Sequence, residues 1–202
     1  HTVSPQWLRQ QSIDQAIEDS QSMVVLNHPN WWQNFDHWPT NLLMQMRRYH
    51  GVEIFNGVMM GEVGSAYALE KWDMLLGSGQ RVWAFANDDT HHATGVGRGW
   101  NMVWAREPSA QGVREALVSG RFYASTGVKI TTISATDKCI RVETDNARRI
   151  IARRDLGQRI THVDGPVMEL ESGQWGDANY VRFEAWGEPE QFAWTQPFWL
   201  RG

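Results

Sequence analysis

Three short, largely apolar runs, each followed at once by polar side chains, place the strongest constraint on the fold. They lie at residues 23–26, 51–57 and 82–86, with segments of helical periodicity between them. Runs of this length predict buried strands, and their alternation with helices predicts a parallel sheet with right-handed crossovers. In β/α barrels, the residues that follow such strands carry the chemistry. The N-terminal half is therefore predicted to hold a functional site at one edge of its sheet.

Between and after these runs the sequence predicts several helices and a further strand. Ser or Thr stands at the start of three of the helices, where its hydroxyl can accept from the first free backbone N–H groups. Helix and strand therefore alternate as far as about residue 127. The expected elements are helices from Ser4, from Thr40, over 66–76 and from Ser109, an apolar run at 102–105 and a strand at 122–125.

Beyond residue 127 the pattern changes to short strand-like segments with turn residues between them and no convincing helix. In one of them, Val181, Phe183 and Ala185 alternate with Arg182, Glu184 and Trp186, which predicts a strand that is buried on one face. The chain is thus predicted to be an α/β protein, with an α/β domain over 1–127 and a small antiparallel β-sandwich over 128–202. The expected strands are 129–135, 140–144, 149–153, 167–171, 180–186 and 192–200.

Charge and hydropathy argue against two classes of partner. The net charge is -4 and no basic run exceeds two residues, so nucleic-acid binding is not expected. No run approaches the ~20 apolar residues that a membrane-spanning helix needs. The lone Cys139 excludes an internal disulfide. Because the chain opens on His1 rather than Met, we expect further residues upstream and assign no compartment.

Histidine and carboxylate side chains gather directly after the predicted strands. His28 follows the first strand, and Pro29 turns the chain so that the imidazole can face an open mouth. Asp89 and His91 follow the third strand at positions i and i+2, which can present an oxygen and a nitrogen to one ion. Such ligands suit Zn²⁺, Mn²⁺ or Fe²⁺. These three residues are the predicted metal ligands, and His92 is a further ligand, a neighbour of the ion or a surface group.

Taken together, these motifs resemble the polymerase-and-histidinol-phosphatase (PHP) superfamily of metal-dependent hydrolases. The closest likeness is to its stand-alone phosphoesterase branch, which includes carbamate-ester hydrolases. The resemblance covers about residues 20–127, and FAWTQPF at 192–198 looks like the β-sandwich that follows the barrel in that branch. The matching motifs are NHPN at 27–30, EIFNG at 53–57, WDMLLGSG at 72–79, DDTHH at 88–92, GRGWNMV at 97–103 and GRFYASTG at 120–127.

The resemblance implies an irregular seven-stranded β/α barrel with two or three divalent metal ions at the carboxyl ends of its strands. In that scheme His28 is the third-motif ligand, and Asp89 with His91 forms the fourth-motif pair. His1 corresponds to a histidine that the family places shortly before this helix, or is a remnant of a tag. The family's first motif, His-x-His followed by Asp-His and Glu, does not occur in the sequence. We therefore expect a partial barrel, with the first motif encoded upstream.

The implied function is metal-assisted hydrolysis of a small phosphate ester. His92 would protonate the leaving group, and Arg98, in a glycine-flanked turn, would clamp the phosphate or is a surface arginine. Glu53, Asn56 and Trp32 are predicted to line the mouth and bind the substrate. Two alternatives stay open. The same metal site could cleave a carboxyl or carbamate ester, or the chain could be a non-catalytic module whose sandwich and twelve tryptophans bind a glycan or partner.

Overall fold

The computed structural model describes residues 6–19 and 21–201, which form a mixed helix-and-sheet protein. The chain divides into two compact units, His1–Gly97 and Arg98–Gly202. The sequence placed its domain boundary near residue 127, so the structural division comes about thirty residues earlier. The reason lies in the strands of residues 100–125, which pair with the C-terminal sheet and not with the N-terminal one.

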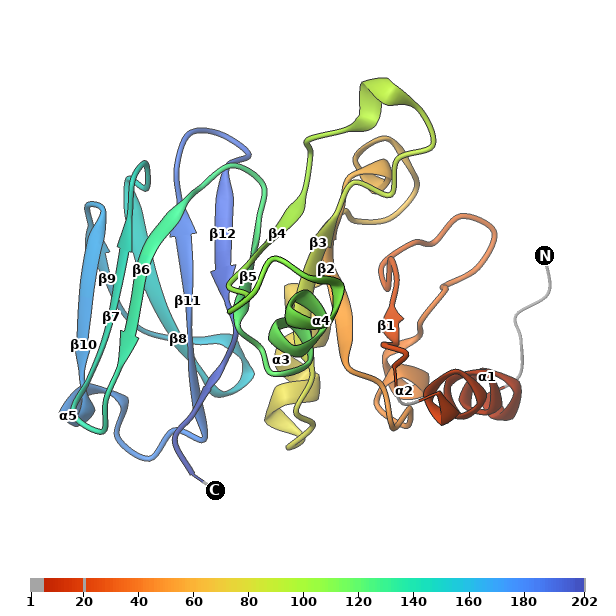
Figure 1. Cartoon of the computed structure of the whole chain (residues 1–202), viewed down its shortest axis with the longest axis horizontal. Coiled ribbons are helices and arrows are strands. Elements are labelled where there is room, and N and C mark those ends of the chain that lie inside the picture. Colours follow the sequence, from red (N-terminus) through yellow and green to blue (C-terminus); the bar gives the residue numbers. More distant parts are fainter. Residues whose placement is uncertain (1–5, 20, 202) are drawn as a thin grey trace. The chain divides into compact units, whose positions relative to one another are not determined.

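The N-terminal unit is built on three parallel strands in the order β1-β2-β3 (Figure 1). These are β1 (Val25–Leu26), β2 (Gly51–Asn56) and β3 (Trp83–Asn87), at the three apolar runs of the sequence. Every residue of β2 is buried, as expected for the central strand of a parallel sheet. The parallel sheet is therefore confirmed for the first three strands, whereas the seven-stranded barrel stays a prediction.

Short helices connect these strands. The helix α3 (Leu69–Gly77) packs against β2, and the Nε1 atom of its fully buried Trp72 donates a hydrogen bond to the Val82 carbonyl just before β3, at 3.0 Å. The helix expected to be capped by Thr40 is a single turn in which Thr40 is the first helical residue and Pro39 occupies the N-cap position, without a side-chain cap. The helices of this unit are α1 (Gln6–Glu18), α2 (Thr40–Leu43), the 3₁₀ turn η1 (Val58–Gly61), α3 (Leu69–Gly77) and the 3₁₀ turn η2 (Ala93–Gly95). Ser4 and Pro5 lie outside the described residues.

The C-terminal unit consists of two antiparallel sheets. One has the order β10-β7-β6, and the other runs β4-β5-β12-β11-β8-β9, with β13 paired to β11. Its elements are β4 (Trp100–Val103), α4 (Ala110–Val118), β5 (Phe122–Ser125), β6 (Ile130–Ala135), β7 (Cys139–Thr144), β8 (Arg149–Arg154), η3 (Asp155–Gly157), β9 (Gln158–Asp164), β10 (Val167–Glu171), α5 (Ser172–Trp175), β11 (Tyr180–Trp186), β12 (Phe192–Thr195) and β13 (Phe198–Trp199).

Both sheets of this unit contribute to one hydrophobic core, which is the arrangement expected of a sandwich (Figure 1). Val142 and Leu170 enter the core from the smaller sheet, and Ile150, Val181 and Phe183 enter it from the larger one. All five side chains are almost completely buried. At the start of α4, the Ser109 hydroxyl accepts a hydrogen bond from the Gly112 backbone N–H at 3.0 Å, which confirms the predicted cap.

Two expectations about this unit were wrong. Strict alternation predicted that residues 122–125 continue the parallel sheet, but β5 pairs antiparallel with both β4 and β12. Periodicity identifies a strand but not its direction, which long-range pairing decides.

The strand β11 was expected to be buried on one face but is buried on both. Its charged residues are paired: Arg182 Nη1 and Glu184 Oε1 lie 2.8 Å apart, and Arg153 Nη2 lies 3.0 Å from Glu184 Oε2. A charged residue can be buried when an oppositely charged side chain pairs with it in this way.

Gly51 provides a test of how tightly the parallel sheet is packed. A Cβ atom at this position would lie 2.6 Å from the Trp83 carbonyl oxygen and would also meet the Phe85 ring. We therefore expect Gly51→Ala to lower the free energy of unfolding by about 1–3 kcal/mol through overpacking. Gly61→Ala is the control, since no atom lies within 4 Å of its Cβ position. Urea denaturation of both variants measures the difference, and equal midpoints would contradict the close approach.

Candidate functional site

The polar residues that follow the three parallel strands lie at one edge of the sheet. His28 comes two residues after β1, Asn56 ends β2, and Asn87 ends β3 with Asp89 shortly beyond it. Because β1 and β3 both run parallel to β2, their carboxyl ends share this edge. The edge therefore brings together side chains from segments that are up to about sixty residues apart in sequence.

Glu53 is the centre of this cluster. Its side chain is only 2% exposed and accepts three hydrogen bonds from neutral N–H groups. They come from the His28 backbone nitrogen at 2.5 Å, Asn56 Nδ2 at 3.0 Å and Asn87 Nδ2 at 2.6 Å. In the described part of the chain no basic side chain forms an ion pair with it. Glu53 thus ties together the ends of all three strands.

A β-bulge explains how Glu53 and Asn56 can meet. Residues i and i+3 of a regular strand point to opposite faces of the sheet, because side chains alternate. The register between β2 and β3 shifts between Glu53 and Phe55, so that β2 carries one additional residue there. Such a bulge redirects the side chains that follow it and is frequent next to functional sites.

Asn56 connects Glu53 to the loop after β3. Its Nδ2 atom donates to Glu53 Oε2 and also to Asp89 Oδ2 at 3.1 Å. Its Oδ1 atom accepts from the backbone N–H groups of Val58 and Met59, at 3.1 and 3.2 Å, which fixes the orientation of the amide. One amide therefore holds two carboxylates near each other at the edge of the sheet.

Two residues of the cluster have strained backbones. His28 and Asp89 adopt positive φ angles of 38° and 52°, a region that residues other than glycine rarely occupy. Pro29 follows His28, and a residue before proline normally prefers extended backbone. Strain of this kind persists only where surrounding contacts impose it, and it concentrates at binding and catalytic sites.

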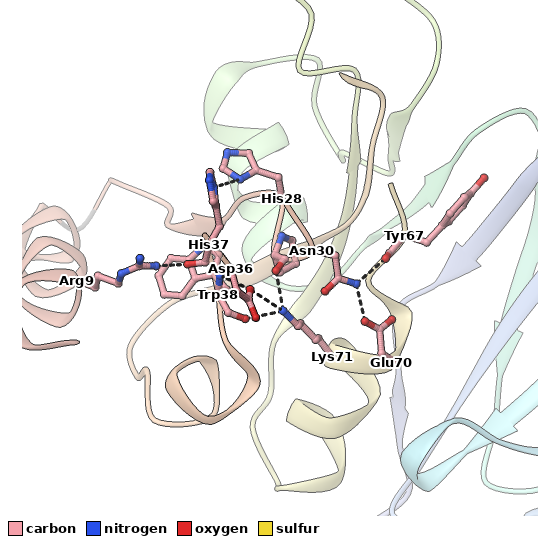
Figure 2. Close-up of polar contacts among 10 residues, drawn as sticks. Arg9, His28, Asn30, Asp36, His37, Trp38, Tyr67, Glu70 and Lys71 are labelled. Carbon is pink, nitrogen blue, oxygen red and sulfur yellow. Dashed lines mark hydrogen bonds and ion pairs between the residues drawn. The ribbon is translucent and has the colours of Figure 1, made fainter. Parts of the chain in front are cut away.

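A second group of contacts surrounds His28 on the loop between β1 and α2 (Figure 2). The Nδ1 atoms of His28 and His37 lie 3.3 Å apart. The His37 ring also stacks on Trp31 and on Phe35. Burial lowers the pKa of His37, and the charges of His28 and Arg9 lower it further, whereas Asp36 raises it. The Arg9 guanidinium donates to the His37 carbonyl, which anchors this loop to α1.

Lys71 of α3 binds two backbone carbonyl groups of the same loop. Its side chain is buried, and Nζ donates to the carbonyl oxygens of Pro29 at 2.7 Å and Trp38 at 2.6 Å (Figure 2). Burial lowers the pKa of Lys71, while Asp36, whose Oδ1 lies 3.6 Å from Nζ, raises it. Because the two carbonyls belong to the neighbours of His28 and His37, Lys71 positions both histidines.

The remaining predicted site residues occupy other positions. His91 and His92 are exposed on the loop after β3, where the Gly97 N–H donates to Asp88 Oδ2 at 2.8 Å. Trp32 is 50% exposed, and Arg98 is an exposed residue of the C-terminal unit. His1 lies outside the described residues. Among the residues that are described, no group of three or more His, Cys, Asp or Glu side chains lies close enough to hold a metal ion.

Sequence reasoning missed three residues that the structure places beside the predicted ones. Asn87 had an available signal, since it directly ends an apolar run just as Asn56 does. The sequence carries no such signal for His37 and Lys71, because only the course of a loop and the packing of α3 bring them close to His28.

Comparison with family models, with curated proteins and with solved structures found no match to this chain. Within the described residues, no helix combines the length and apolar character needed to cross a membrane.

The role of Glu53 can be tested with Glu53→Gln. One acceptor oxygen becomes an NH₂ group that faces an N–H donor, so we expect a loss of about 1–3 kcal/mol in the free energy of unfolding. Glu62→Gln is the matched control, because Glu62 is exposed just after η1. Chemical denaturation compares the two variants, and a Glu53→Gln protein as stable as the control would refute the three-donor arrangement.

Proposed function

We propose that this chain belongs to a metal-dependent hydrolase of the PHP type and that it cleaves a small phosphate ester. The observation that supports the proposal is the arrangement around Glu53. Its carboxylate links the segment that carries His28 to Asn56, and Asn56 in turn binds Asp89. The backbone of His28 and the carboxylate of Asp89 thus belong to one hydrogen-bonded network at the carboxyl edge of a parallel sheet, where α/β enzymes bind their ligands.

The donor chemistry of this edge suits Zn²⁺, Mn²⁺ or Fe²⁺, because it offers imidazole and carboxylate groups together. In this proposal His28, Asp89 and His91 hold the ions, with His1 or an upstream histidine in addition. The described side chains do not by themselves form a group of three around one position. A complete centre with two or three ions therefore requires ligands beyond those that the structure brings together.

When bound, such ions supply an acidified water and neutralise charge on the phosphoryl oxygens. The chain's own residues have separate tasks. Asn56 orients the Asp89 carboxylate by a hydrogen bond, and Glu53 holds the backbone of His28. Hydrogen bonds of this kind orient metal ligands and raise affinity. His92 is proposed to protonate the leaving group.

A specific observation also favours the binding module as a second candidate. Trp100, Met102 and Trp104 alternate along and just beyond β4, which is an edge strand of the larger sheet in the C-terminal unit. All three are exposed, and Trp104 is 72% exposed. Aromatic side chains on one face of an edge strand suit a glycan or a peptide partner.

Hydrolysis assays with added Mn²⁺ or Zn²⁺ test the proposed function. We expect the protein to cleave bis(p-nitrophenyl) phosphate, to lose activity with a chelator, and to lose about 100-fold in kcat/KM on Asp89→Asn. His162→Ala, on the exposed strand β9, is the control and should retain full activity. Cleavage of p-nitrophenyl acetate instead would favour the ester hydrolase, and no metal-dependent activity on either substrate would favour the binding module.

Trp32 provides a test of substrate contact. Because its side chain is half exposed, Trp32→Ala should leave the free energy of unfolding within about 0.5 kcal/mol of the wild type. If Trp32 forms an apolar wall for the organic group, KM for an aryl phosphate should rise several-fold while KM for methyl phosphate stays unchanged. A large loss of stability with unchanged KM would instead assign Trp32 to packing of the loop.

A further inference from the structure

We propose that His37 joins His28 in binding a divalent ion of the zinc type, through the Nδ1 atoms of both rings. This inference rests on the proposed function, because His28 is already a ligand there, and it adds a residue that the sequence did not indicate. The ion would lie between the two imidazoles on the loop that connects β1 to α2, which Figure 2 shows.

The spacing of the two rings supports a shared ion. Their Nδ1 atoms are 3.3 Å apart and their ring centroids 5.1 Å apart. Two Zn–N bonds of about 2.05 Å at a tetrahedral angle place the nitrogens about 3.3 Å apart and the ring centroids about 5.2 Å apart. A straight N–H···N hydrogen bond of the same length would separate the centroids by about 5.6 Å. At least one ring is therefore turned away from the line that joins the two nitrogens, as the binding of a shared ion would require.

The surroundings hold both rings in this orientation. His37 is stacked between Trp31, at 4.8 Å and 22°, and Phe35, at 4.5 Å and 19°. His28 meets the same Trp31 edge to face, with centroids 4.9 Å apart. Side chains that are fixed before binding lose little entropy when the ion arrives, which favours affinity.

Lys71 acts as the positioning residue of the pair. Its Nζ atom binds the carbonyl of Pro29, next to His28, and that of Trp38, next to His37. The nearby Asp36 carboxylate accepts a hydrogen bond from the Trp38 backbone N–H at 3.1 Å and lies close to Lys71. The imidazoles of His28 and His37 supply two ligands and leave the other positions of a four-coordinate ion for water or a phosphate oxygen.

Titration calorimetry of the chelator-treated protein with Zn²⁺ alone tests the inference, with Co²⁺ absorption as a second readout. We expect His28→Ala and His37→Ala each to raise the dissociation constant at least tenfold, and His162→Ala to leave it unchanged. His37→Phe keeps a ring between Trp31 and Phe35 but removes the nitrogen, so it should lose affinity while circular dichroism shows an intact fold. Lys71→Met should weaken binding less than either histidine variant.

The outcomes separate this inference from the proposed function. If His28→Ala loses affinity and His37→Phe binds Zn²⁺ like the wild type, the pair is only a hydrogen bond; the inference fails and the hydrolase proposal stands. If neither variant changes Zn²⁺ affinity, His28 is not a ligand and both proposals fail. X-ray absorption of the zinc-bound wild type and of His37→Phe provides a direct check, since we expect one imidazole fewer around the ion in the variant, and equal numbers would overturn the inference.

Discussion

A buried carboxylate at the centre of the parallel sheet determines the arrangement of the N-terminal unit. Removing a carboxylate from water is costly unless hydrogen bonds replace the lost solvation. Glu53 obtains these bonds from His28, just after β1, and from Asn56 and Asn87, the last residues of β2 and β3. The strand ends must therefore lie close together for the buried charge to be satisfied. The same requirement explains why the bulge in β2 and the strained backbone of His28 are tolerated.

A buried cation has the corresponding role on the adjacent loop. Lys71 replaces its lost solvation with two backbone carbonyls that stand nine residues apart in sequence, at Pro29 and Trp38. The segment between them is thereby closed into a compact loop, and its aromatic side chains stack on His37. The hydrogen bonds of Glu53 and those of Lys71 together place His28 between the edge of the sheet and the His37 ring. The proposed binding of a metal ion by His28 and His37 depends on this placement.

Much of the local structure could be predicted from the sequence. The three apolar runs correctly located β1, β2 and β3, and Ser109 correctly located the start of α4. The errors concern elements whose structure depends on contacts with residues far away in the sequence. The strand β9 was missed because most of its residues are exposed and polar, and pairing with β8 defines it. The helix expected from Thr40 ends after one turn, and the barrel and the metal centre that the resemblance implies stay predictions.

The sequence by itself determined the positions of β1, β2 and β3 and the chemical groups at their ends, because apolar periodicity and turn residues act over a few positions. Only the tertiary structure decided that β5 turns antiparallel into the C-terminal sheet, that Glu53 is buried among neutral donors, and that His37 faces His28. These features depend on contacts between residues far apart in the chain. Their free energies involve burial and geometry that no local pattern encodes.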